Sequence, residues 1–193
     1  ALVCGGTALA AAAALAESFA VIIAAYILLM LAYSVFLKKM MILDVIVISV
    51  GFVLRAVAGA VVVGVFISPW LIICTFALCL FLGFSKRRSE AIQLGDEADS
   101  FRNTLSGYTP ELLSHMLDVS SGLAVVCFLL YAMDQRTLRI FGTNNLVYTT
   151  PFVLYCIFRF SALIQRGRYS GPVQLITHDW PFQVGFGLWV LCC

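Results

Sequence analysis

The sequence predicts an all-α transmembrane protein, and three observations lead to this prediction. First, the 193 residues are 62% hydrophobic and only 11% charged, whereas about a quarter of the residues in soluble domains are charged. Second, long apolar runs follow one another along the chain with polar stretches between them. Third, these runs lack the period-two alternation that is typical of membrane barrel strands. Helices satisfy their own backbone hydrogen bonds in lipid, so the apolar runs are expected to be helical.

Seven segments are predicted to enter the membrane, where a crossing helix needs about 20 apolar residues. In order, they are residues 1–15, 19–37, 42–67, 70–84, 112–133, 146–164 and 182–193. The first is rich in alanine, whose small side chain lets helices pack closely. The first and last segments are cut short by the ends of the sequence, so we expect the chain to be part of a longer protein with further helices upstream.

The distribution of Lys and Arg predicts the orientation of these segments. Three polar loops, residues 38–41, 85–111 and 165–181, fall on one side of the predicted membrane. They hold Lys38, Lys39, Lys86, Arg87, Arg88, Arg102, Arg166 and Arg168, whereas the opposite loops hold Arg136 and Arg139. The positive-inside rule therefore makes the first side cytoplasmic. We expect a single partial domain over residues 1–193, with residues 85–111 as its longest cytoplasmic loop.

Other classes of protein are disfavoured by composition. A net charge of +2 is too small to indicate a nucleic-acid partner. The seven cysteines lie in apolar runs and include no C-x-x-C pair, so neither a disulfide framework nor a zinc site is expected.

Two groups of basic residues are candidates for binding phosphate. Lys38 directly follows the second segment, where its ammonium could contact a phosphate or anchor the helix at the interface. Lys86, Arg87 and Arg88 follow the fourth segment, with Glu90 close behind. If the helix continues past residue 84, Lys86 and Glu90 share one face. Three bases at a helix end suit a diphosphate, although a solvated basic flank has the same pattern.

Ionisable residues inside the apolar segments are the remaining candidates. Arg55 lies near the middle of the third segment, and Asp44, Asp118 and Arg159 lie in this and other segments. A charge at membrane depth costs several kcal/mol, so it normally faces a polar cavity or a partner. A transporter with Arg55 and Asp118 along its pathway is one alternative, but it predicts inverted repeats, which we do not recognise here.

The sequence also resembles a known family. The stretches Tyr33-Ser to Lys38, Asp44 to Gly59, Phe81 to Glu90, Tyr108-Thr-Pro to Leu113 and Tyr148 to Phe160 occur in order along the chain. They resemble the central helices of bacterial decaprenyl-phosphate phosphoribosyltransferases, a branch of the UbiA prenyltransferase superfamily. The resemblance implies a UbiA-like helical bundle in the inner (plasma) membrane, with about seven of its nine transmembrane helices present and an active site open to the cytoplasm.

The resemblance also implies an activity. Members of this branch transfer phosphoribose from phosphoribosyl diphosphate to a polyprenyl phosphate and release diphosphate, with Mg²⁺ as cofactor. The wider superfamily transfers a prenyl group from its diphosphate to an aromatic acceptor, which is the alternative function. In both reactions, metal ions and basic groups stabilise the departing diphosphate.

Roles for individual residues follow from the same resemblance. Phosphate contact is expected from Lys38, Lys86, Arg87 and Arg88, a metal-side carboxylate from Glu90, and the cavity wall from Arg55, Tyr108 and Arg159. No single catalytic residue is predicted. The first acidic motif of the family, Asn-Asp-x-x-Asp-x-x-x-Asp, is absent from this sequence. Because that motif carries the main Mg²⁺ ligands, the sequence alone is expected to be inactive.

Overall fold

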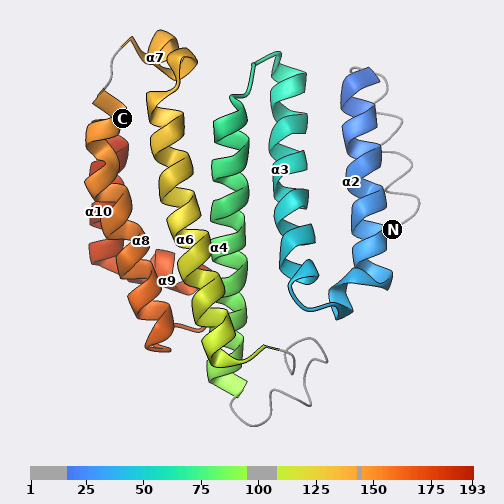
Figure 1. Ribbon diagram of the computed structural model, residues 1–193, viewed down its shortest axis with the longest axis vertical. Coiled ribbons are helices and arrows are strands. Elements are labelled where there is room, and N and C mark those ends of the chain that lie inside the picture. The colour runs from blue at the N-terminus through green and yellow to red at the C-terminus, as the bar shows by residue number, and fades with distance from the viewer. Residues whose placement is uncertain (1–16, 95–107, 143–144) are drawn as a thin grey trace. The chain divides into compact units, whose positions relative to one another are not determined.

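The computed structural model describes residues 17–94, 108–142 and 145–193, and every regular element in these residues is a helix (Figure 1). Four helices are long and apolar enough to cross a membrane, namely Leu43–Val63, Pro69–Gln93, Pro110–Met133 and Asn145–Gln165. The predicted all-α transmembrane fold is therefore confirmed. The predicted segment 1–15 lies outside the described residues. The chain divides into two compact units, Ala1–Ile67 and Ser68–Cys193.

The described part of the first unit is a helical hairpin. Helix α2 (Glu17–Val35) is joined to α3 (Leu43–Val63) through a short 3-10 turn, η1 (Leu37–Lys39). The two helices approach closely at Gly51, where an added Cβ would lie 2.8 Å from the Met30 Cε atom. Helix α3 ends at Gly64, whose φ of 71° is in the left-handed region, as is common at helix C-termini.

The second unit contains the remaining elements. They are α4 (Pro69–Leu94), α6 (Pro110–Met133), α7 (Gln135–Phe141), η3 (Asn145–Thr149), α8 (Thr150–Gln165), α9 (Pro172–His178) and α10 (Trp180–Cys192). Helices α4 and α6 run antiparallel along most of their length, and α8 packs beside α10 (Figure 1). Phe160 of α8 joins these pairs, because its ring lies 5.1 Å from Phe81 of α4 and 6.1 Å from Phe182 of α10.

Capping residues fix where two of these helices begin. The Thr109 side chain accepts a hydrogen bond from the Leu112 backbone N–H at 3.2 Å, and α6 starts at the next residue. The Asp179 carboxylate accepts one from the Phe182 N–H at 2.9 Å at the start of α10. A proline in the first turn of each helix loses no hydrogen bond there.

Two boundaries differ from the sequence prediction. Helix α4 does not end near residue 84 but continues to Leu94, so the first part of the predicted loop 85–111 is helical. Residues 85–94 contain no Gly or Pro, and most are good helix formers. In the predicted loop 165–181, residues Pro172–His178 form the short helix α9. The polar sequence marks where the apolar surface ends, not where the helix ends.

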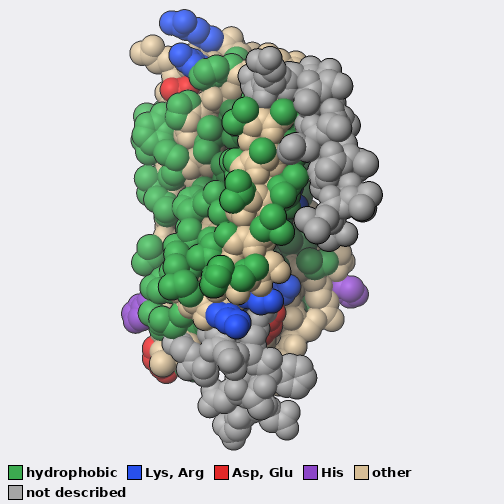
Figure 2. Space-filling model, turned by 90° about the vertical axis from the view of Figure 1, so that its right-hand side faces the viewer, with side chains coloured by type: hydrophobic (Ala, Val, Ile, Leu, Met, Phe, Trp, Pro, Cys, Tyr) green, Lys and Arg blue, Asp and Glu red, His purple; other side chains and the backbone are tan. Residues whose placement is uncertain are grey.

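Many large apolar side chains of the described helices are exposed. Figure 2 shows hydrophobic side chains over most of the helical surface that faces the viewer. Leu28 is 70% exposed, Val119 70% and Phe158 65%. Large exposed apolar areas are unfavourable in water, so these side chains fit contact with lipid.

The close approach of α8 and α10 provides a test of this packing. A Cβ added at Gly185 would lie 2.6 Å from the Tyr155 ring, so Gly185→Val should destabilise the protein by about 1–3 kcal/mol through overpacking. Gly187→Val, two residues along the same helix, is the control because nothing lies within 4 Å of its added Cβ. Thermal unfolding in detergent measures both variants, and equal midpoints for the two would contradict the packing described.

Candidate functional site

The basic residues predicted to bind phosphate lie on the last turns of α4, in a segment that we call the basic turn (residues 85–90). Successive helical residues point about 100° apart, so three consecutive bases cannot share one face. Lys86 is exposed, Arg87 is only 4% exposed and Arg88 is half-buried. The three bases therefore point in different directions, and their predicted contact with phosphate stays a prediction.

An ion pair organises the basic turn. Arg87 Nη1 donates a hydrogen bond to Glu90 Oε2 at 2.7 Å, and the side chains of Arg87 and Glu90 are 5% and 27% exposed. The neighbouring Ser85 and Ser89 are also buried, at 0% and 1% exposure. A buried cation is stable only when it is paired and hydrogen-bonded. Arg87 meets this requirement through Glu90, one turn further along the helix.

Other segments of the second unit reach the same end of α4. Gly167, which follows α8, approaches Ile92 so closely that an added Cβ would lie 2.7 Å from the Ile92 Cγ2 atom. Tyr108, predicted to line a cavity, is 5% exposed and lies just before α6.

Arg136 and Arg139 belong to α7, at the opposite end of α6 (Figure 1). Within this unit, the predicted separation of the more basic loops from Arg136 and Arg139 is confirmed.

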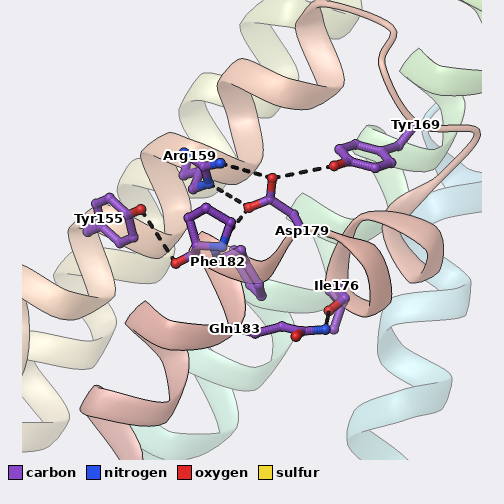
Figure 3. Close-up of polar contacts among 8 residues, drawn as sticks. Tyr155, Arg159, Tyr169, Ile176, Asp179, Phe182 and Gln183 are labelled. Atoms are coloured by element: carbon purple, nitrogen blue, oxygen red, sulfur yellow. Dashed lines mark hydrogen bonds and ion pairs between the residues drawn. The ribbon is translucent and has the colours of Figure 1, made fainter.

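Arg159, also predicted to line a cavity, is engaged in a second ion pair (Figure 3). Its Nε and Nη2 atoms donate to Asp179 Oδ1 and Oδ2 at 2.6 and 2.9 Å, and the Tyr169 hydroxyl donates to Oδ2 at 3.4 Å. Asp179 is 4% exposed. Hydrogen bonding from Arg159 lowers the pKa of the Asp179 carboxyl, although burial acts in the opposite direction. This pair joins α8 to the start of α10.

The remaining predicted residues belong to the first unit. Lys38 is exposed in η1. Arg55 donates from Nε to the Gly51 carbonyl at 3.2 Å, and its guanidinium lies 4.3 Å from the Phe52 ring centroid and 5.4 Å from that of Tyr26. Cation–π contacts of this kind stabilise a cation away from water. Arg55 thus has local partners within the hairpin.

Glu90 is the residue predicted to supply a carboxylate to a magnesium ion. In residues 17–94, 108–142 and 145–193, no three His, Cys, Asp or Glu side chains come together as metal ligands. Glu90 supplies one carboxylate, and one of its oxygens is bound to Arg87. Mg²⁺ is usually held by one or two carboxylates together with substrate phosphates and water. Glu90 therefore fits one position of such a site but not a whole one.

An apolar cavity of about 380 Å³ lies between α4, α6, α8 and α10 in the second unit. Leu78, Phe81 and Leu82 form its wall on α4. The same stripe of the helix continues one turn further at Ser85, because residues three and four apart share a face. The cavity therefore begins next to the basic turn and extends toward the apolar part of the bundle.

Some of these residues escaped the sequence reasoning. Asp179 was not expected as the partner of Arg159, although an aspartate before Trp-Pro is a recognisable helix start. Ser85 and Ser89 were not singled out either. Ser85 and Ser89 lie four and eight residues after Phe81, so the three residues share one helical face. The burial of the two serines depends on neighbouring helices that no local pattern identifies.

No family model matches the sequence. The chain is 30% identical over 184 residues to a protein of Mycolicibacterium smegmatis named decaprenyl-phosphate phosphoribosyltransferase. The matched region covers 91% of the chain and 57% of that relative. Proteins of the same name are 28% identical in Corynebacterium glutamicum and 26% identical in Mycobacterium tuberculosis, over 91% and 98% of the chain.

The chain is related to the decaprenyl-phosphate phosphoribosyltransferases. This relationship confirms the resemblance found in the sequence. The chain spans about half of the length of the curated relatives from M. smegmatis and C. glutamicum, at 57% and 53%. The relationship to these proteins and the four long apolar helices together identify a multi-pass membrane protein.

Because of the Arg159–Asp179 pair, the free energy of unfolding of the protein is expected to depend on pH. Asp179→Asn should lower the free energy of unfolding by about 3 kcal/mol at pH 7, because Arg159 loses its charged partner. The folded pKa of Asp179 is lower than the unfolded value, so the stabilisation is complete above about pH 4 and is lost as the pH falls further.

Thermal unfolding in detergent between pH 7 and pH 3 measures this effect. The gap between the wild type and Asp179→Asn should narrow toward the acid end, because part of the stabilisation is lost below the unfolded pKa of an aspartate. A gap of constant size over the whole range would show that the charge of Asp179 does not stabilise the fold.

Proposed function

We propose that this chain is part of a membrane transferase that moves phosphoribose from phosphoribosyl diphosphate to a polyprenyl phosphate and releases diphosphate. The observation that carries the proposal is the basic turn, where an exposed lysine stands beside a buried ion pair at the end of a membrane helix. The relatives named decaprenyl-phosphate phosphoribosyltransferase support the choice of substrates.

The basic turn suits the diphosphate group. Lys86 presents a compact, exposed positive charge, and Arg88 adds a second cation on an adjacent face. Positive groups fixed in advance lower the barrier when negative charge develops on a leaving diphosphate. Mg²⁺, when bound, would neutralise part of the same charge, and Glu90 is the described carboxylate that would face it.

The apolar cavity suits the lipid substrate. Its lining is formed by aliphatic and aromatic side chains such as Leu78, Phe128 and Phe160, and it begins one helical turn from the basic turn. An isoprenoid chain attached to a phosphate needs both surroundings side by side. This continuity supports a polyprenyl phosphate as the acceptor.

The orientation of the site is part of the proposal. The basic turn, Arg166 and Arg168 lie toward the end of the second unit that is opposite Arg136 and Arg139 of α7. By the positive-inside rule, the basic turn faces the cytoplasm of a cell with an inner (plasma) membrane. Phosphoribosyl diphosphate, a highly charged soluble molecule, would be met on that side.

The function is tested by assay of the whole natural protein in membranes with labelled phosphoribosyl diphosphate and polyprenyl phosphate. A lipid-linked pentose phosphate is expected as the product. Prenylation of an aromatic acid from a polyprenyl diphosphate, with no lipid-linked pentose, would overturn the proposal.

Lys86→Gln is expected to reduce kcat/KM for phosphoribosyl diphosphate by roughly 10- to 100-fold, because one charge opposite the diphosphate is removed. Arg166→Gln is the matched control, since Arg166 is an exposed cation at the end of α8 that lies outside the basic turn. Steady-state transfer rates measure both variants. An equal, small effect of the two substitutions would exclude direct contact by Lys86.

A further inference from the structure

We propose that Arg87 is a positioning residue that serves the diphosphate site through Glu90 and does not itself contact the phosphates. The inference rests on the proposed function and divides the basic turn into two roles. Lys86 contacts the ligand, whereas Arg87 holds the Glu90 carboxylate in place and cancels its charge.

Exposure separates the two roles. The side chain of Arg87 is 5% exposed and that of Glu90 is 27% exposed, so the carboxylate is the part of this pair that a ligand can reach. Lys86, the residue before Arg87, is exposed. A ligand arriving at the end of α4 therefore meets the ammonium of Lys86 and the outer edge of Glu90, with Arg87 behind them.

Charge explains why the site needs Arg87. A carboxylate next to a diphosphate repels it, and this repulsion is strong where little water screens the charges. Arg87 Nη1 lies 2.7 Å from Glu90 Oε2, which offsets the negative charge and fixes the orientation of the carboxylate. Glu90 can then accept a hydrogen bond from a sugar hydroxyl, or contact a cation that accompanies the diphosphate, without excluding the anion.

Arginine suits this role better than lysine. Its planar group offers five donors in a fixed arrangement, so one can bind Glu90 while others bind neighbouring acceptors. The nearby Ser85 and Ser89 are buried, so the guanidinium lies in surroundings from which water is largely excluded. A buried arginine of this kind maintains the geometry of a site rather than recruiting its ligand.

Binding of inorganic diphosphate to the whole natural protein in lipid nanodiscs tests the inference. Arg87→Gln should weaken binding about tenfold, because the positive charge that offsets Glu90 next to the anion is removed. Adding Glu90→Gln should restore binding to within about threefold of the wild type, since the repelling charge is then gone. Arg87→Gln/Glu90→Gln binding as weakly as Arg87→Gln alone would overturn the inference, because it would mean that Arg87 contacts the phosphates directly.

Two further variants keep the test decisive. Arg87→Lys preserves the charge and should bind diphosphate at least threefold more tightly than Arg87→Gln; if it binds as weakly, charge compensation is excluded. Arg139→Gln removes an exposed cation from α7, at the other end of the unit, and should leave binding unchanged. If Arg87→Gln fails to fold, the comparison is made between Arg87→Lys and Arg87→Lys/Glu90→Gln. Weaker diphosphate binding by this double variant than by Arg87→Lys would contradict the inference.

Calorimetry detects the bound diphosphate without any turnover. The result therefore separates this inference from the proposed function. If the variants show the expected binding pattern but the protein forms no lipid-linked pentose, the role of Arg87 stands and the proposed substrate is wrong. If the protein transfers phosphoribose but Glu90→Gln does not restore diphosphate binding, only the proposed role of Arg87 is wrong.

Discussion

The basic turn depends on one constraint, which is that the inward-facing cation of Arg87 must be paired where it lies. Helix α4 carries its charges directly beyond its apolar turns, without an intervening loop. An uninterrupted helix gives each side chain a fixed direction, so Arg87 is turned inward while Lys86 stays outside. The pair with Glu90 makes the inward position stable, and the difference between a supporting and a ligand-facing base follows from it.

The same constraint explains the other deep arginines. Arg159 lies within an apolar helix and binds Asp179 through two nitrogen atoms, which also fixes the start of α10. Arg55 lies in the middle of α3 and is held over two aromatic rings. Arg55 and Arg159 therefore both have partners within the protein, so depth in the membrane alone does not mark a residue as part of a substrate site.

Much of the fold could be predicted from hydropathy. Six of the seven predicted segments coincide with described helices, because long apolar runs must be helical in lipid. The end of α4 was misplaced because hydropathy reports contact with lipid, whereas a helix can continue into water.

The candidate site was predictable only in part. The basic run was visible, and so was the one-turn spacing to Glu90. However, Lys86 and Arg87 both lie about one turn before Glu90, and only the packing of neighbouring helices decides which of them is buried. The pairing of Arg159 with Asp179 spans 20 residues, so it depends on the way α8 and α10 meet. Local sequence identifies the charged residues, and tertiary contacts assign their partners.

Chemical footprinting of lysines tests whether Lys86 contacts a diphosphate at the end of α4. The whole natural protein is acylated with an amine reagent, with and without phosphoribosyl diphosphate, and the modification of each lysine is quantified by mass spectrometry. The ligand is expected to protect Lys86 several-fold and to leave Lys39, an exposed lysine of the other unit, unchanged. Equal modification of Lys86 with and without the ligand would show that Lys86 does not contact the diphosphate.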